Sequence, residues 1–305
     1  MKRILLLLAS LLVMMPSISY GQTPVWQGKG RIAYSCDGNE HDDDDWGATP
    51  MSLALMAARG LQDKVTLFVY SDHIWGSNYE KGVRFGMTPY EHMRESALKG
   101  KDYFGFDNTE FICAVDNPEV AYRAMRDEIN KSTANDPLII IAAGPLQVVG
   151  EAISRAKPDK LKYVTLISHG RWNNIHANNP DGPFWDRHTG WTWEMLTSRF
   201  GGKIPGGGVK FIMPLDQNGG KDYDGLQSNK KNFDWLITSE ARNNPLYKRD
   251  SWNWLYSRLA VCIRRDGVNF DCSDSGMVIY MLTGEEKTSP AMAREIMENP
   301  VPKIQ

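Results

Sequence analysis

The segment "DPLIIIAAG", residues 136–144, constrains the fold more than any other stretch of the chain. Its apolar run lacks the alternation of a half-exposed strand, so a strand formed from it is buried on both faces. Four similar runs lie at residues 31–36, 64–71, 109–115 and 161–170. Segments with helical patterns separate the strands, at 49–60, 89–100, 117–132 and 145–156. The alternation predicts an α/β fold, with an open, mostly parallel, doubly wound sheet flanked by helices.

Finer features follow from local signals. Thr49 is expected to be the N-cap of the first helix, with Pro50 at its first position and Gly60 past its end. The Gly- and Trp-rich stretch 170–230 predicts loops. The rest is expected to be mostly helical, at 231–238, 250–264, 275–283 and 289–298. Cys262 and Cys272 flank a turn, and whether they pair as a disulfide is left open.

The N-terminus has the pattern of an export signal. Lys2 and Arg3 precede a short apolar run, and Ser19-Tyr20-Gly21 gives a small-x-small cleavage pattern. We therefore expect a cleaved signal peptide at 1–21, a single α/β domain over 22–305 and a periplasmic or secreted protein. No later stretch is long and apolar enough to predict a membrane span.

Composition narrows the partners. A formal net charge of -2 argues against nucleic acid and against anionic membranes. The chain has ten tryptophans, several of them in predicted loops, and flat rings pack well on the C–H faces of sugars. We expect a sugar-containing small molecule or oligosaccharide as partner. Assembly into a homo-oligomer is left open.

Residues 37–45 concentrate negative charge. Asp37, Glu40 and Asp42 to Asp45 put six carboxylates in nine residues, between the first strand and the first helix. In open α/β sheets ligands bind at the edge where the strands end. Oxygen ligands without cysteine point to Ca²⁺ or Mg²⁺, and Ca²⁺ accepts more carboxylates. The alternative is a solvated charge run, which the position between a buried strand and its helix disfavours.

Three motifs resemble those of the nucleoside hydrolase family. Asp37 is followed by Asp44-Asp45 ahead of "WGATPMSLAL", the strand "LIIIAA" is followed by "GPLQVV", and Asp274 opens the apolar "SDSGMVIYMLTG". The resemblance covers roughly the whole mature chain. It implies the family's fold and hydrolysis of a glycosidic bond.

The resemblance also implies a Ca²⁺ site. Its ligands would be Asp37, Asp45, Asp274 and the main-chain carbonyl of Ala143, with Asp44 alongside; the longer loop of this chain adds Asp42. In the family the cation binds two sugar hydroxyls and a water, and an aspartate takes the proton of that water. Asp37 is the candidate base, a role suited to a carboxylate within hydrogen-bond reach.

The substrate half of the site departs from the family. Ser273 stands where many members have a histidine that protonates the leaving group, so His73 and His169 are the candidate acids. The candidate substrate-binding residues follow the second and fifth strands: Asp72, Trp172, Asn173, Asn174 and His176. For the histidines and asparagines, a role in shaping strand ends and turns remains an alternative.

Three functions remain open. The first is calcium-dependent hydrolysis of an N-glycosidic bond, as in a nucleoside N-ribohydrolase. The second is hydrolysis of an O-glycosidic bond in a scavenged oligosaccharide at the same calcium site, which export and the loop tryptophans favour. The third is calcium-dependent sugar binding without turnover, which the serine at position 273 favours.

Overall fold

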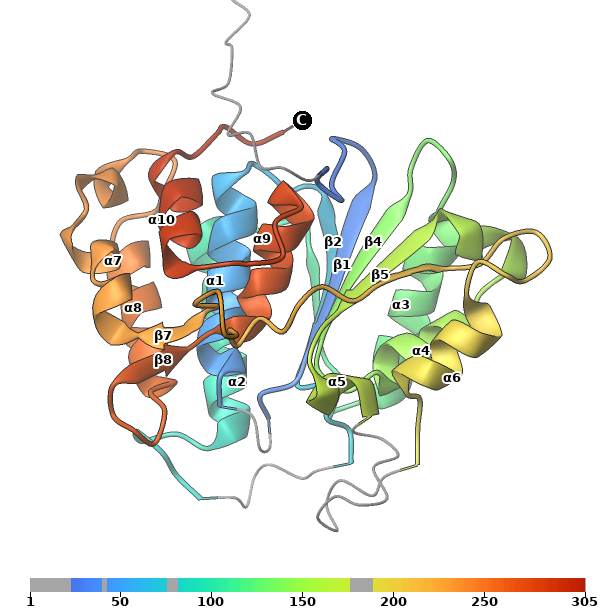
Figure 1. Ribbon diagram of the computed structural model, residues 1–305, viewed down its shortest axis with the longest axis horizontal. Helices are drawn as coiled ribbons and strands as arrows, with labels where there is room; N and C mark the ends of the chain where they lie inside the picture. The colour runs from blue at the N-terminus through green and yellow to red at the C-terminus, as the bar shows by residue number, and fades with distance from the viewer. Residues whose placement is uncertain (1–22, 40–42, 76–81, 176–188, 305) are drawn as a thin grey trace, which may run out of the picture.

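The computed structural model describes residues 23–39, 43–75, 82–175 and 189–304. Its centre is a six-stranded sheet in the order β3-β2-β1-β4-β5-β6 (Figure 1). Every neighbouring pair in it is parallel. The strands are β1 (Arg31–Cys36), β2 (Val65–Tyr70), β3 (Glu110–Cys113), β4 (Leu138–Ala143), β5 (Val164–Ser168) and β6 (Lys210–Ile212). The predicted α/β, doubly wound class is confirmed.

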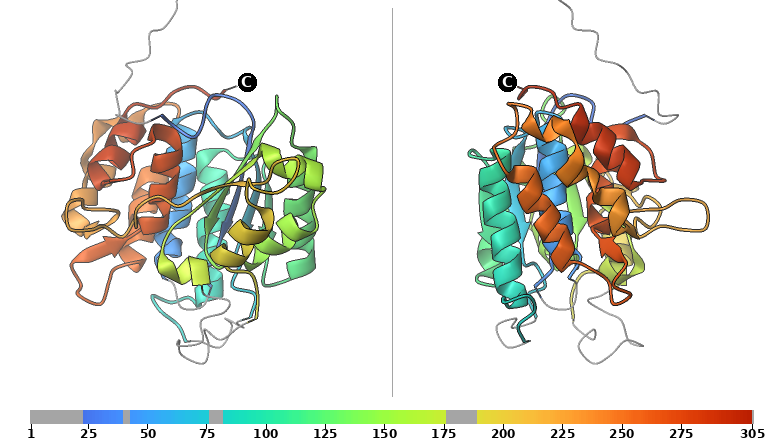
Figure 2. Two further views of the ribbon diagram at one scale, coloured as in Figure 1. Left: turned by 45° about the vertical axis from the view of Figure 1, so that its right-hand side comes forward. Right: turned by 90° about the vertical axis from the view of Figure 1, so that its left-hand side faces the viewer.

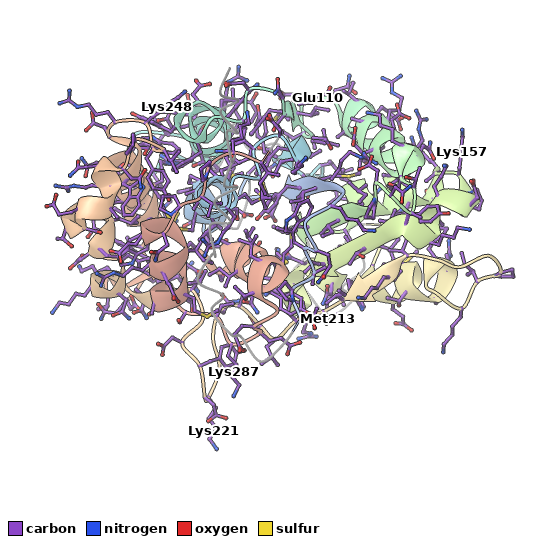
Figure 3. The ribbon with its side chains drawn as sticks, turned by 90° about the horizontal axis from the view of Figure 1, so that it is seen from above. Glu110, Lys157, Met213, Lys221, Lys248 and Lys287 are labelled. Carbon is purple, nitrogen blue, oxygen red and sulfur yellow. The ribbon has the colours of Figure 1, made fainter. Side chains whose placement is uncertain are left out.

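Helices cover both faces of the sheet (Figures 1 and 2). One layer holds α1 (Asp45–Ala58), α2 (Pro89–Phe104), α7 (Trp235–Thr238), α8 (Ser251–Val261), α9 (Gly276–Thr283) and α10 (Pro290–Glu298). The other holds α3 (Pro118–Lys131), α4 (Gln147–Ser154) and α6 (Trp193–Phe200). The short α5 (Arg171–Ile175) follows β5. Seen from above, the two layers lie on opposite sides of the strands (Figure 3).

The strands bury side chains on both faces, as their apolar runs require. In β4, Ile139 and Ile141 belong to the core under α1, whereas Leu138 and Ile140 belong to the core under α3 and α4. All six residues of β4 are buried. Because both faces of the sheet are covered, polar side chains reach water only at the strand ends, and that is where a site can form.

The first helix begins earlier than its sequence signals predict. α1 starts at Asp45 with Asp44 as its N-cap, so Thr49 is not the cap and Pro50 lies inside the helix. Proline lacks the N–H that would bond the carbonyl four residues back, which is that of Trp46. The hydroxyl of Ser96 in α2 donates to this carbonyl at 2.6 Å. The contact with another helix therefore replaces the bond that Pro50 cannot make.

The stretch 170–230 contains more regular structure than predicted. Besides α5 and α6 it supplies β6, which extends the main sheet, and β7 (Gln227–Asn229). β7 pairs antiparallel with β8 (Asn269–Asp271) in a separate two-stranded sheet. These strands have three residues each, too few to produce a periodic pattern in the sequence.

The four cysteines are free thiols. The thiol of Cys262 donates to the carbonyl of Arg258 at 3.2 Å, and that of Cys272 to the carbonyl of Leu226 at 3.6 Å. The two side chains are thus directed to different carbonyls, and the disulfide considered from the sequence is not formed.

The predicted signal peptide lies outside the described residues. Within the described part of the chain, no helix has the length and apolar character needed to cross a membrane.

The hydrogen bond from Ser96 to the Trp46 carbonyl, which replaces the one that Pro50 cannot make, gives a first testable prediction. Ser96→Ala should lower the free energy of unfolding by about 1–3 kcal/mol, because it leaves the Trp46 carbonyl buried without a donor. In a Pro50→Ala background, where residue 50 regains its N–H, the same change should cost less. Urea unfolding of the four proteins measures the difference.

Ser154→Ala is the matched control, since Ser154 also donates to a helix carbonyl, that of Glu151, but at an exposed position. It should cost little in either background. If Ser96→Ala lowered the free energy of unfolding equally in both backgrounds, Ser96 would not be replacing the donor that Pro50 lacks.

Candidate functional site

The strand order places a switch point between β1 and β4. The chain runs outward from β1 through β2 to β3 on one side, and from β4 through β5 to β6 on the other. Ligands of open α/β sheets bind at this point, outside the carboxyl ends of the strands. Asp37 directly follows β1 and Gly144 directly follows β4. Asp72 and His169 follow β2 and β5, so four predicted segments meet at one edge.

Gly144 allows the two strand-end aspartates to approach. A Cβ at this position would lie 2.5 Å from Oδ1 of Asp72 and 2.9 Å from the backbone nitrogen of Asp37. No side chain larger than hydrogen fits there without displacing one of them. The glycine of the "AAGPL" motif therefore has a local physical reason: it lets both aspartates pack against β4.

The carboxylates at this edge are buried. Asp45 is fully buried, and Asp37, Asp72 and Asp274 are between 1% and 6% exposed. Both oxygens of Asp45 and Oδ1 of Asp72 accept a hydrogen bond from no N–H or hydroxyl donor within the described residues. Oδ2 of Asp72 accepts from the hydroxyl of Ser35 at 2.5 Å. Buried carboxylate oxygens without donors are costly and call for a positive partner.

Burial and mutual repulsion perturb these acids. Burial is the main cause that raises the pKa of Asp37, Asp45 and Asp72 above their ordinary values, and the charge of Asp274 adds to it at each of them. Asp37 and Asp45 lie close enough to share a proton, which further raises the pKa of Asp45. The cluster thus favours protonation unless a cation balances its charge.

Asp44 and Asp45 occupy the start of α1. Asp44 accepts from the backbone nitrogen of Asp45 at 3.0 Å and from the hydroxyl of Ser273 at 3.1 Å. Negative charge is favourable at a helix N-terminus, because the peptide dipoles point their positive end there. The indole of Trp46 donates to the carbonyl of Gly38 at 2.6 Å and so fixes the turn after Asp37.

Asp274 reaches the site from a distant part of the chain. It lies in the short turn Ser273–Ser275 that precedes α9. Asp271 at the end of β8 accepts from the backbone nitrogen of Ser273 at 3.2 Å, which anchors the turn. Because Ser273 also bonds Asp44, this turn is tied directly to the N-terminus of α1.

His169 is fixed by hydrogen bonds on both ring nitrogens. Nε2 lies 2.5 Å from Oδ1 of Asp274, and Nδ1 lies 3.2 Å from the backbone nitrogen of Gln217 and 3.6 Å from Oδ1 of Asp216. Burial lowers the pKa of the imidazole, but Asp274 and Asp216 outweigh it and raise the pKa to about 9. The ring either accepts from Gln217 when neutral or donates to both carboxylates when charged.

The segment after β2 is held in an unusual conformation. Ser71, between β2 and Asp72, has φ +55°, which is uncommon for a residue with a side chain. The side chain of Asn39 donates to the carbonyl of His73 and accepts from its backbone nitrogen, both at 3.2 Å. Strained backbone that is held by its surroundings clusters at functional sites. The His73 ring lies edge-on to Trp75, with centroids 5.6 Å apart.

The candidate residues after β5 fall into two groups. Asn173 and Asn174 are buried in α5. The amide of Asn174 accepts from the hydroxyl of Ser168 and donates to the sulfur of Met213, both at 3.4 Å, so it ties α5 to β5 and to the segment after β6. Trp172, on the same helix, is partly exposed. For Asn174 these contacts favour the turn-shaping alternative.

Two candidates, Asp42 and His176, lie outside the described residues. Within the described ranges, no three His, Cys, Asp or Glu side chains are gathered tightly enough to form a metal site as they stand. The donor set nevertheless fits a hard cation, because it consists of buried carboxylate oxygens, several of them without donors. The Ala143 carbonyl accepts from the backbone nitrogen of Asp37 at 3.3 Å and has a second lone pair for a cation.

Three residues that support the site were not predicted from the sequence. Asn39 clamps the backbone of His73, and Asp216 and Gln217 hold the outer nitrogen of His169. Asn39 lies within the acidic run 37–45, but it carries no charge and so was not among the predicted residues. Asp216 and Gln217 follow β6, and a strand of three residues gave no signal that a strand end was near.

Comparisons with known proteins place the chain in a family. No family model matches it. It is 30% identical over 263 residues to uncharacterized protein P22 from Formosa agariphila, with 84% of each chain covered. The chain belongs to the family of that protein. A solved inosine-uridine preferring nucleoside hydrolase from Bacillus anthracis matches with a TM-score of 0.41 and 13% identity, over 82% of this chain and 81% of that one. At this TM-score the likeness has no weight in assigning a function.

The close approach at Gly144 gives a second testable prediction. Gly144→Ala should lower the free energy of unfolding by about 1–3 kcal/mol, because its methyl group must displace Asp72 or the backbone of Asp37. Denaturant unfolding measures the loss. Gly202→Ala is the control, since a Cβ at residue 202 meets nothing within 4 Å. Equal stability of the two variants would show that the strand ends are more loosely packed than described.

Proposed function

We propose that the protein is a calcium-dependent hydrolase of glycosidic bonds, with the N-glycosidic bond of a nucleoside as the first candidate. One observation carries the proposal: four buried aspartates from four separate segments meet at the switch point of the sheet. Such a cluster has no structural use that a hydrophobic core would not serve at lower cost. Resemblance of the three motifs to the nucleoside hydrolases supports the same chemistry.

The roles of the residues follow from their contacts. Asp37, Asp45 and Asp274, with the Ala143 carbonyl, would hold Ca²⁺, and Asp44 would lie alongside. A bound Ca²⁺ supplies positive charge that orients sugar hydroxyls and eases deprotonation of a water. Asp37 would be the group that accepts a proton from water, a role suited to an acid whose pKa burial raises above its ordinary value. Negative charge from the remaining carboxylates stabilises an oxocarbenium-like transition state.

The leaving group needs a proton from another residue. Ser273 is buried, and its hydroxyl donates to Asp44, so it orients that carboxylate. His73 and His169 are the proposed acids. His169 also touches Asp274, so its replacement is expected to disturb the cation site. His73 is held through its backbone by Asn39, at the end of the strand next to Asp37.

The same tests distinguish two other candidate functions. Hydrolysis of an O-glycosidic bond would use the same carboxylates and is favoured by the tryptophan content of the chain. Sugar binding without turnover is favoured by Ser273, which offers no acid. Product analysis separates the three: a free nucleobase, a reducing sugar, or neither.

The third prediction concerns the cation. Excess Ca²⁺ should raise the melting temperature and a chelator should lower it, because a ligand that binds the native state stabilises it by mass action. Asp45→Asn and Asp274→Asn should each reduce the Ca²⁺-induced shift. The double variant should be little worse than the worse single one, because both residues would bind the same ion. Thermal unfolding with and without Ca²⁺ is the measurement.

Asp159→Asn is the control for the cation prediction, since this exposed aspartate lies at the opposite edge of the sheet, before β5. It should keep the full shift. Absence of any shift in the unmodified protein would reject calcium.

The fourth prediction concerns the acid. His73→Ala should cut turnover by roughly 10²–10⁴-fold while the Ca²⁺-induced shift in melting temperature persists, because general acid catalysis contributes about that much. His169→Ala should reduce both turnover and the shift, because it removes a contact of Asp274. Assays on nucleosides and on oligosaccharides, with Ca²⁺ saturating, give the comparison. Full activity in both variants would eliminate these histidines as acids.

A further inference from the structure

One arginine from the segment that leads into α2 contacts the residues on both sides of Asp44 and Asp45. The guanidinium of Arg84 forms an ion pair with the carboxylate of Asp43, which directly precedes the two aspartates. The same guanidinium lies over the ring of Trp46, which directly follows them, 5.5 Å from the ring centroid. We call these two contacts the Arg84 clamp. They hold the start of α1 at two points, from a segment that is distant in the chain.

The backbone that carries Arg84 is itself fixed. Arg84 and Met87 exchange two backbone hydrogen bonds, at 2.9 and 3.1 Å, and so close a two-residue turn. Both central residues, Phe85 and Gly86, have positive φ, as in a type I′ turn. The ring of His92 in α2 donates from Nε2 to the Arg84 carbonyl at 2.7 Å. The turn is therefore attached to α2, which packs against α1 in the same layer (Figure 1).

His92 also holds Trp46. The two rings are stacked, with centroids 4.0 Å apart and planes 16° from parallel. Nδ1 of His92 accepts from the guanidinium of Arg258 in α8 at 3.0 Å, while Nε2 donates to the Arg84 carbonyl. With one nitrogen accepting and the other donating, the imidazole is neutral, and burial lowers its pKa. A neutral ring from α2 and the guanidinium of Arg84 thus both pack on the indole.

The position of Trp46 affects the site because its indole holds the turn after β1. The residue is 1% exposed, and its ring nitrogen donates to the carbonyl of Gly38 at 2.6 Å. Gly38 directly follows Asp37, and a Cβ on it would lie 2.7 Å from Cβ of Asp45. A shift of the indole would therefore move the backbone that lies between these two aspartates.

The clamp is better placed to orient ligands than to stabilise the fold. The side chains of Arg84 and Asp43 are 45% and 33% exposed, and ion pairs of that exposure contribute little to stability. At metal sites, by contrast, replacing a residue that orients the ligands without touching the ion weakens metal binding roughly 10–100-fold. The contacts of Arg84 are therefore expected to matter for the geometry of Asp44 and Asp45.

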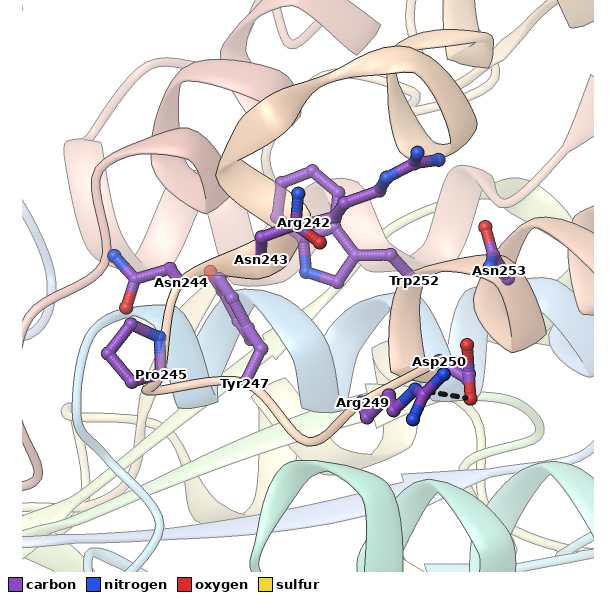
Figure 4. A pocket seen from close by; sticks show the side chains of 9 residues that line it. All are labelled: Arg242, Asn243, Asn244, Pro245, Tyr247, Arg249, Asp250, Trp252 and Asn253. Carbon is purple, nitrogen blue, oxygen red and sulfur yellow. Dashed lines mark ion pairs between the residues drawn. The ribbon is translucent and has the colours of Figure 1, made fainter.

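The two arginines of the pocket in Figure 4 differ from Arg84 in this respect. Arg249 is paired with its neighbour Asp250 at 3.7 Å, and Arg242 donates to the carbonyl of Ile237, in the preceding turn of chain. Both contacts join residues that are close in the sequence. Arg84 instead joins two segments that meet at the strand-end site.

We propose that Arg84 is a positioning residue of the strand-end site, which fixes Asp44 and Asp45 in the orientation in which they would hold the cation. This inference rests on the calcium site of the proposed function, although the contacts of Arg84 form without a cation. It also divides the acidic run. Asp44 and Asp45 belong to the site, whereas Asp43 belongs to the clamp.

Calorimetric titration of the full chain with calcium chloride tests the effect on affinity. The clamp variant combines Arg84→Gln with Asp43→Asn, so it removes both partners of the ion pair and leaves the net charge unchanged. It should bind Ca²⁺ about tenfold more weakly than the unmodified protein. The matched control combines Lys303→Gln with Asp63→Asn. It removes an ion pair of similar exposure, 39% and 34%, beside the start of β2 at the opposite edge of the sheet, and should keep the affinity.

A second set of measurements is made with a chelator and does not depend on calcium. The ¹⁵N signal of the Trp46 indole is identified by its loss in Trp46→Phe. In the clamp variant the indole proton should exchange faster with water, because the ring is held less firmly against the Gly38 carbonyl. In the control variant its exchange should stay unchanged. Urea unfolding should give the two double variants equal free energies of unfolding.

Three results would each overturn the proposal. They are equal Ca²⁺ affinity of the clamp and control variants, an unchanged indole exchange rate in the clamp variant, and a free energy of unfolding clearly lower in the clamp variant than in the control. The last would make the contacts of Arg84 part of the fold's stability alone. If the unmodified protein binds no Ca²⁺, the proposed function fails instead, and indole exchange alone decides the role of Arg84.

Discussion

Repulsion among four buried carboxylates is the constraint on which the arrangement of the site depends. Asp37 and Asp45 flank one loop, whereas Asp72 and Asp274 come from other parts of the chain, and each of the four is withdrawn from water. Folding alone gains nothing from collecting them, since each ionised group loses hydration and meets like charge. The surrounding polar contacts, from Ser35 to Asp72 and from His169 to Asp274, offset only part of this cost. The fold therefore holds the cluster in place through packing elsewhere.

That packing comes from the parallel sheet. β1 and β4 are neighbours through their whole length, from Arg31 opposite Leu138 to Cys36 opposite Ala143. The register brings Asp37 and Gly144 side by side at the switch point. On the α1 side the site rests on a large apolar core, and the turn before α9 attaches Asp274 to it. The strands and helices thus position groups that would separate if they were free to do so.

The sequence was informative where pattern and position coincide. Long apolar runs predicted the sheet, and residues after those runs, such as Asp37, Asp72 and His169, proved to share one edge. The sequence predicted the start of α1 wrongly, because Thr49-Pro50 has the pattern of a helix start. The carbonyl of Trp46, which Pro50 leaves without a backbone donor, accepts instead from Ser96 on another helix. The sequence was silent on Asn39 and Asp216, whose contacts exist only after folding. Local signals cannot report a hydrogen bond between residues that are distant in the chain.

Pro50 also changes how the first turn of α1 is held. The first turn, which carries Asp45, shares no hydrogen bond with residue 50 and is attached through Trp46 to Ser96. The Ser96 hydroxyl in turn accepts from Arg258 of α8 at 3.0 Å, and Arg258 also bonds His92 of α2. Through these contacts, motion of α2 or α8 would be passed to Trp46, the neighbour of Asp45 in the first turn of α1. Amide exchange in that turn would report its contact with the two neighbouring helices as well as the stability of its own helix.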